Sequence, residues 1–236
     1  MSPTAILVYM DFIRNYQLFL FDLDGLLVNT EELHYRAYCD MVKARGFTLP
    51  WDFPAYFQIA QQDSRAPERA IYKEFPKLFE QEPSWAVLYA EKKEAYRKLI
   101  ENEPAPLLPG VESLLVHLKQ LEKQRAVVTH TSRELVDIIR SKNPVLNTIT
   151  HWFCREDYAE AKPSPDGYLK AIATLGDPSW NIIGFEDSYR GMCSLMGTKA
   201  TAVLVNAHDE ALRKRFQDKR IYTLESFEEI RIGDFN

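Results

Sequence analysis

The sequence predicts an α/β fold, a doubly wound parallel sheet of the Rossmann type with an inserted helical lobe. Four short apolar runs have the length and composition of buried strands: residues 17–21, 126–128, 182–185 and 201–205. The segments between the later runs place apolar residues at helical spacing, as at Leu114, Leu115 and Leu118. Alternating strands and helices predict a parallel sheet with helices on both faces and ligands at the carboxyl ends of the strands.

One region interrupts this alternation. From Glu31 to about Pro106 the chain is rich in helical periodicity, aromatic residues and charge, and it contains no convincing strand. We therefore expect two domains, an α/β core made of residues 1–30 and 107–236 and a helical cap made of residues 31–106.

The composition excludes several classes of protein. With 46% hydrophobic and 27% charged residues, the 236-residue chain is typical of a globular protein. A net charge of −5 gives no basic footprint for nucleic acid, and no apolar run approaches the ~20 residues that span a bilayer. Three widely spaced cysteines and the lack of a secretory leader favour the cytoplasm. We expect no nucleic-acid or membrane partner, and a monomer or weak dimer.

Two aspartates follow the first strand directly, in the sequence Asp22-Leu23-Asp24-Gly25. Residues two apart on an extended chain point the same way, so both carboxylates can share a site. Paired carboxylates repel unless one is protonated or a cation is present, and an oxygen-rich site suits Mg²⁺. The four residues alone fit equally well a turn in which the aspartates bond to backbone groups.

Polar side chains also stand at the ends of other predicted strands. Thr129 follows residues 126–128, Lys162 precedes a predicted helix, and Glu186 and Asp187 follow residues 182–185. Each has a structural alternative, as a helix cap or as a solvated loop charge. Because the carboxyl ends of parallel strands meet at one edge of a sheet, the combination favours a single site.

The four motifs resemble, in order, those of the haloacid dehalogenase superfamily, and the resemblance covers nearly the whole chain. The corresponding positions are residues 21–25, Thr129, Lys162 and the pair Glu186 and Asp187. The helical lobe stands where that family inserts its cap of the first type. Residues 21–38 and 162–166 resemble the branch that contains beta-phosphoglucomutase and related phosphatases.

The resemblance implies a magnesium-dependent phosphoryl transfer. Asp22 would attack phosphorus and form an aspartyl phosphate, while Asp24 would protonate the leaving oxygen and later deprotonate water. Thr129 and Lys162 would bind the phosphoryl oxygens. His130 either touches the same phosphate or is a loop histidine satisfied by a neighbour. The implied Mg²⁺ ligands are Asp22, Asp24 through its backbone carbonyl, Asp187 and, directly or through water, Glu186.

Three residues of the lobe match cap positions of that branch: His34, Arg65 and Lys92. Lys92 lies in an apolar helical stripe, where it either extends its ammonium to water or faces an anionic substrate. His34 either helps to time the movement of Asp24 or packs on the helix face against Tyr38.

These features predict a phosphatase of a small phosphate monoester, such as a sugar, polyol or nucleoside phosphate. Asp63, near Arg65, would repel a second phosphate group, so hydrolysis is preferred to a phosphomutase reaction. The phosphomutase is the alternative, and a regulator that binds a phosphorylated ligand without turnover is a third. Dehalogenation is disfavoured because dehalogenases of the family lack an acid at the position of Asp24.

Overall fold

The chain divides into two compact units in the computed structural model, which describes residues 11–60, 62–63, 65–205, 210–216 and 221–230. One unit comprises residues 1–29 and 106–236, and the other comprises residues 30–105. The bounds expected from the sequence differ from these by one residue at each junction.

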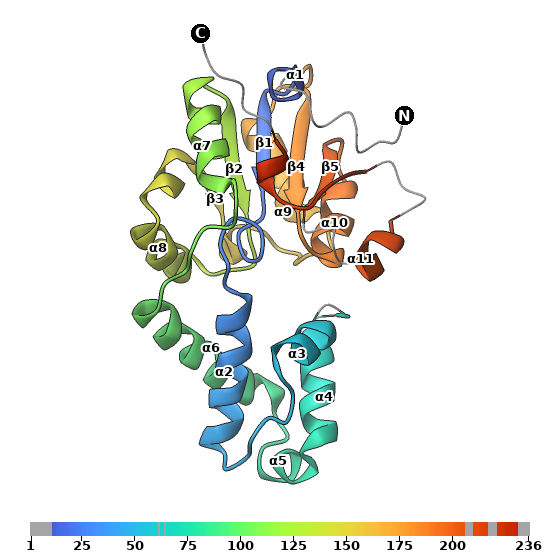
Figure 1. Cartoon of the computed structure of the whole chain (residues 1–236). Helices are drawn as coiled ribbons and strands as arrows, with labels where there is room; N and C mark the ends of the chain where they lie inside the picture. The colour runs from blue at the N-terminus through green and yellow to red at the C-terminus, as the bar shows by residue number, and fades with distance from the viewer. Residues whose placement is uncertain (1–10, 61, 64, 206–209, 217–220, 231–236) are drawn as a thin grey trace. The chain divides into compact units, whose positions relative to one another are not determined.

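The first unit contains a six-stranded sheet in which every pair of neighbours is parallel, with the order β3-β2-β1-β4-β5-β6 (Figure 1). The strands are β1 Leu18–Phe21, β2 Gln124–Val128, β3 His151–Phe153, β4 Ile182–Glu186, β5 Thr201–Val205 and β6 Tyr222–Leu224. The predicted doubly wound fold is confirmed, and four of these strands coincide with the predicted runs. The edge strands β3 and β6 were not predicted, because three residues are too few to give a periodic signal.

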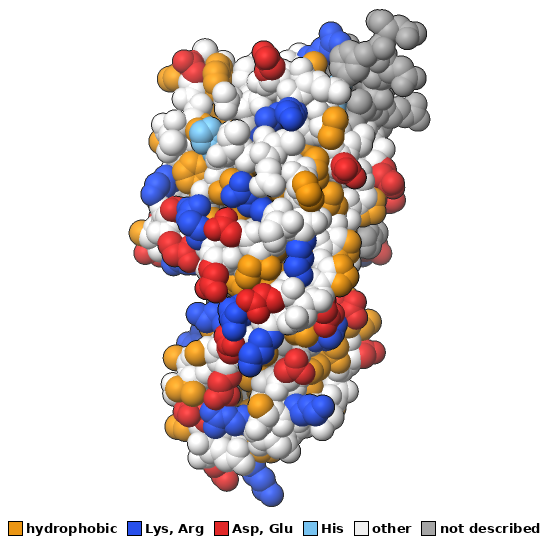
Figure 2. Space-filling view, turned by 90° about the vertical axis from the view of Figure 1, so that its left-hand side faces the viewer, with side chains coloured by type: hydrophobic (Ala, Val, Ile, Leu, Met, Phe, Trp, Pro, Cys, Tyr) orange, Lys and Arg blue, Asp and Glu red, His pale blue; other side chains and the backbone are white. Residues whose placement is uncertain are grey.

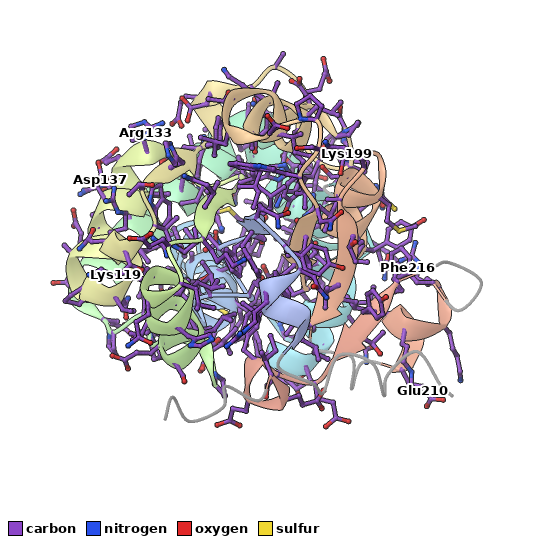
Figure 3. All side chains as sticks on the ribbon, turned by 90° about the horizontal axis from the view of Figure 1, so that it is seen from above. Lys119, Arg133, Asp137, Lys199, Glu210 and Phe216 are labelled. Atoms are coloured by element: carbon purple, nitrogen blue, oxygen red, sulfur yellow. The ribbon has the colours of Figure 1, made fainter. Side chains whose placement is uncertain are left out.

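Helices lie on both faces of this sheet, as Figure 3 shows from above, with Lys119 of α7 on one flank and Phe216, after α11, on the other. The described helices of this unit are α1 Asp11–Arg14, α7 Val111–Gln120, α8 Arg133–Lys142, α9 Asp166–Leu175, α10 Tyr189–Met196 and α11 Glu210–Lys214. The described residues of the unit also form the 3₁₀ turns η2 Pro144–Thr148, η3 Arg155–Asp157 and η4 Phe227–Glu229.

Each face of β1 packs against a different set of side chains. Leu18 and Leu20 belong to a buried cluster with residues of α9 and α10. The alternate residues Phe19 and Phe21 point to the other face. There the rings of Phe21 and Phe185 stack with their centroids 5.2 Å apart, and Phe227 of η4 packs edge-on against both. Burial on both faces explains why β1 is continuously apolar.

The strand register brings the polar ends of three strands together. Phe21 of β1 pairs with Val127 of β2 on one side and with Phe185 of β4 on the other. The backbone N–H of Asp22 continues the ladder by donating to the carbonyl of Phe185 at 3.2 Å. The residues that follow these three strands therefore lie at the same edge of the sheet.

The second unit is helical, as predicted, and no strand occurs among its described residues. Its helices are α2 Glu31–Ala44, α3 Phe53–Ala60, α4 Ala66–Glu74, α5 Pro76–Gln81 and α6 Trp85–Asn102. The residues that α6 buries are Leu88, Lys92, Tyr96 and Ile100, an i, i+4 series along one face. Tyr89, on the same helix, is 41% exposed.

The described surface gives no sign of a membrane span or of a basic patch on the side that Figure 2 shows. No described helix combines the length and the apolar character required to cross a membrane. Acidic and basic side chains alternate on the face in Figure 2 without gathering into a region of one sign.

Gly184, in the middle of β4, provides a test of the core packing. A Cβ atom there would lie 2.4 Å from Cδ1 of the fully buried Leu195 in α10. We expect Gly184→Ala to lower the free energy of unfolding by about 1–3 kcal/mol, because Leu195 has little room to move. Urea denaturation measures the loss. In a Leu195→Ala background the same glycine substitution should cost less, and equal costs in both backgrounds would contradict the proposed contact.

Candidate functional site

A buried lysine joins two of the strand ends. Lys162, which is 8% exposed, donates from Nζ to Oδ1 of Asp22 at 2.5 Å and to Oε1 of Glu186 at 2.7 Å. Asp22 follows β1, Glu186 ends β4, and Lys162 lies in the loop before α9. Three segments that are distant in the sequence are thus tied together by one ammonium group at the polar edge of the sheet.

Burial and charge shift the pKa values of this pair. Burial raises the pKa of Asp22 to about 7, against the opposing effect of the Lys162 ammonium. Burial alone would lower the pKa of Lys162, but the charges of Asp22 and Glu186 raise it above its usual value. Lys162 therefore remains a cation, and the charge state of Asp22 responds to any further positive charge brought to the site.

Glu186 is fully buried and is held from one side only. Its Oε1 accepts from the phenol of Tyr168 at 2.5 Å as well as from Lys162. Burial raises the pKa of Tyr168 well above its usual value, so the phenol keeps its proton and donates. The second oxygen, Oε2, has no hydrogen-bond partner among the described residues and occupies the space beside Gly191, where a Cβ would lie 1.7 Å from it.

Asp24 is held by two hydroxyl groups from the segment after β2. Thr131 donates from Oγ1 to Oδ2 of Asp24 at 2.5 Å, and Thr129 donates to the same oxygen at 3.4 Å. The backbone N–H of Thr131 also donates to Oγ1 of Thr129 at 3.0 Å. The carboxylate of Asp24 is therefore oriented by threonines, whereas that of Asp22 is oriented by Lys162.

His130 connects the segment after β2 to the lysine loop. Its Nε2 accepts the backbone N–H of Lys162 at 2.7 Å. Burial, followed by the charge of Lys162, lowers the pKa of His130 to about 3, so the ring is neutral and carries its proton on Nδ1. The backbone N–H of Lys162 therefore gives Nε2 of His130 a hydrogen-bond donor, and Nδ1 remains as the donor of the ring.

Three carboxylates are close enough to bind one cation. Ligand oxygens of Asp22, Glu186 and Asp187 all lie within 4.8 Å of one another. Hard carboxylate oxygens are the ligands that Mg²⁺ prefers in proteins. The fit is supported by Oε2 of Glu186, a buried anionic oxygen without a hydrogen-bond donor among the described residues, because a nearby cation would compensate its charge.

In the helical unit, Lys92 and His34 form a pair that the sequence did not predict. Lys92 is 4% exposed, so its ammonium does not extend into water, and its Nζ lies 2.7 Å from Nδ1 of His34. The ammonium also lies 5.0 Å from the ring centroid of Tyr38 and 5.1 Å from that of Tyr96, within cation–π range. His34 stacks on Tyr96 with the ring centroids 4.0 Å apart.

Arg65 differs from this pair because it lies at the surface of the unit. Its side chain is 73% exposed and donates from Nε to Glu68 at 2.9 Å. The roles in substrate binding predicted for Arg65, Lys92 and His34 remain predictions.

Two residues of the site were missed by the sequence analysis: Thr131 and Tyr168. Thr131 follows Thr129 by two positions, a spacing at which an extended chain can present both hydroxyls to the same side. Tyr168 lies at helical spacing from the apolar residue Ile172, a pattern that indicates only a packed helix face. The available signal was its phenol, since a buried tyrosine hydroxyl normally has a hydrogen-bond partner.

Comparison with known proteins agrees with this geometry. A family model described as haloacid dehalogenase-like hydrolase matches residues 19–205. Protein CbbY from Rhodobacter capsulatus is 29% identical over 188 residues, which cover 78% of this chain and 83% of that protein. Hexitol phosphatase A from Escherichia coli is 26% identical over 216 residues, covering 88% and 91%. A crystal structure of a CbbY mutant from Rhodobacter sphaeroides in complex with xylulose-(1,5)bisphosphate has a TM-score of 0.70 at 25% identity, covering 92% and 96%.

The His34–Lys92 pair leads to a prediction about pH. Burial, followed by the charge of Lys92, lowers the pKa of His34 well below 6.5. As the pH falls below about 6.5, the unfolded chain binds a proton that folded His34 does not, so stability falls by up to ~1.4 kcal/mol per pH unit. Urea denaturation at pH 7.5 and 5.5 should show a larger loss in the wild type than in His34→Asn, which keeps a hydrogen-bond acceptor for Lys92. His130 and the carboxylates contribute to both proteins, and an identical pH dependence in the two would contradict the assignment.

Proposed function

The chain belongs to the haloacid dehalogenase-like hydrolase family, as its motifs indicated, and from this premise we propose that it is a magnesium-dependent phosphatase. Its substrate would be a small phosphate monoester, a sugar, polyol or nucleoside phosphate, and the phosphoryl group would pass through an ester on Asp22. The observation that carries the proposal is the buried Asp22 carboxylate beside the Lys162 ammonium and two further acids. A relative named as a hexitol phosphatase supports the substrate class.

Asp22 would act as the nucleophile. Its ammonium partner, at 2.5 Å, favours the carboxylate over the acid and would also attract the incoming phosphoryl oxygens. Thr129 lies at the same edge of the sheet with a hydroxyl that can donate to those oxygens. Attack by Asp22 divides hydrolysis into two displacements, each easier than a direct attack by water.

Asp24 would supply and then remove a proton. Asp24 follows the nucleophile by two residues, and Oγ1 of Thr131 donates to its Oδ2 at 2.5 Å. In the first step the acid form would protonate the leaving oxygen, and in the second step the carboxylate would deprotonate the attacking water.

Mg²⁺ would be held by the carboxylates of Asp22, Glu186 and Asp187 and by the backbone carbonyl of Asp24. When bound, the ion would reduce the repulsion between the nucleophile and the phosphate. It would also favour the charged form of Asp22, whose pKa burial raises to about 7.

The cap residues would select the substrate. Lys92 and Arg65 provide positive charge, and His34 fixes the position of the Lys92 ammonium. A phosphomutase is the alternative, since the same core residues would serve it and only the group that accepts the phosphoryl differs. A magnesium-dependent screen of phosphorylated sugars, polyols and nucleosides distinguishes the two when phosphate release and isomer formation are measured in parallel.

Replacing the nucleophile tests the proposal directly. We expect Asp22→Asn to lower phosphate release from p-nitrophenyl phosphate in Mg²⁺ by at least about a thousandfold, because the amide cannot form the ester. Asp137→Asn, a substitution of a 63% exposed aspartate in α8, is the matched control and should keep full activity. Circular dichroism checks that both proteins fold. Substantial turnover by a folded Asp22→Asn protein would refute the assignment.

The bond between His130 and the Lys162 backbone leads to a second prediction. Without it the lysine loop is less firmly positioned, so His130→Ala should lower kcat/KM by roughly tenfold to a hundredfold. His130→Gln offers a carbonyl oxygen that can accept the Lys162 N–H, and we expect it to recover most of the activity. Steady-state kinetics on p-nitrophenyl phosphate measure both. Equal impairment in the two variants would mean that the acceptor is not what the reaction requires.

A further inference from the structure

A tyrosine hydroxyl lies inside the charged cluster, and the proposed chemistry does not use it. Tyr168, in the first turn of α9, is fully buried. Its hydroxyl lies 2.5 Å from Oε1 of Glu186 and 3.5 Å from Nζ of Lys162, which is itself 5.1 Å from the centroid of the phenol ring. The phenol is therefore in contact with both the acid at the end of β4 and the base in the lysine loop.

The hydroxyl changes how the ammonium is shared. Lys162 serves two carboxylates, Asp22 and Glu186, and a fully buried carboxylate held by a single donor would attract the ammonium more strongly. Tyr168 gives Oε1 of Glu186 a second donor. Glu186 is then held by two donors, and Lys162 keeps its contact with Asp22.

The same hydroxyl fixes the orientation of Glu186. With Oε1 bonded to Tyr168 and Lys162, the carboxylate plane is set, and Oε2 is directed to the space beside Gly191. Because Glu186 is one of the three acids whose oxygens lie within 4.8 Å of one another, its orientation affects how well the three can surround a cation. Partners of metal-binding carboxylates act in this indirect way in many metal sites.

We propose that Tyr168 is a positioning residue, which holds Glu186 through its hydroxyl and thereby sets the affinity of Asp22, Glu186 and Asp187 for a divalent cation. This inference rests on the proposed function, since it assigns the three acids to a metal. Tyr168 itself touches neither the substrate nor the reacting atoms.

The test removes only the hydroxyl. We expect Tyr168→Phe to weaken Mg²⁺ binding, measured by isothermal titration calorimetry, by about tenfold or more, and to raise the Mg²⁺ concentration for half-maximal activity by the same factor. At saturating Mg²⁺, KM for p-nitrophenyl phosphate should be nearly unchanged. Tyr16→Phe is the matched control, because it removes a hydroxyl that donates to Thr201 at 3.2 Å in the same unit, and it should bind Mg²⁺ as the wild type does.

A second variant separates positioning from packing. Replacing Tyr168 by 4-aminophenylalanine keeps a hydrogen-bond donor at the same place and should retain Mg²⁺ affinity close to that of the wild type. If Tyr168→Phe does not fold, the 4-aminophenylalanine variant tests the proposal by itself. A tenfold loss of Mg²⁺ affinity in that variant would overturn the proposal. Unchanged Mg²⁺ affinity in a folded Tyr168→Phe protein would also overturn it. If the wild type neither binds Mg²⁺ nor releases phosphate with it, the proposed function fails first and this inference fails with it.

Discussion

The candidate site depends on the placement of one ammonium group in the interior. Nζ of Lys162 lies 2.5 Å from Oδ1 of Asp22 and 2.7 Å from Oε1 of Glu186. The side chains of Lys162 and Glu186 are more than nine-tenths buried, and that of Asp22 is 13% exposed. Burying an unpaired charge is costly, so the ammonium and the carboxylates each lower the cost of burying the other. Without the ammonium, the carboxylates of Asp22 and Glu186 would repel each other at the edge where the strand register brings β1 and β4 together.

The rest of the site supports this arrangement. His130 accepts the backbone N–H of Lys162, so the segment after β2 holds the loop from which the ammonium reaches in. Tyr168 bonds to the same oxygen of Glu186 as the ammonium does. The lysine neutralises part of the negative charge that Asp22, Glu186 and Asp187 concentrate, and a divalent cation would neutralise the remainder. Lysine and metal would thus both compensate the charge of one cluster of oxygens.

Sequence reasoning found the parts of the fold that short-range patterns encode. β1, β2, β4 and β5 were predicted because strands buried on both faces are continuously apolar, and the residues after them could be grouped because parallel strands end at one edge. The edge strands β3 and β6 carry no such pattern. The roles of Thr131, Tyr168 and His130 depend on which atoms meet after folding, which no spacing rule specifies. Lys92 shows this most clearly, because the sequence did not predict its contacts with His34 and with the rings of Tyr38 and Tyr96.

The structure also changes the reasoning that favours hydrolysis over phosphoryl transfer between sugars. From the sequence alone, the negative charge of Asp63 is expected to repel a second phosphate group. In the cap, however, Arg69 donates to Oδ2 of Asp63 at 2.6 Å and to Oδ1 at 3.1 Å, a two-point contact that offsets this charge. Arg65, although exposed, is similarly paired with Glu68. The charges around Arg65 are therefore balanced, and the charge of Asp63 no longer distinguishes hydrolysis from a phosphomutase reaction.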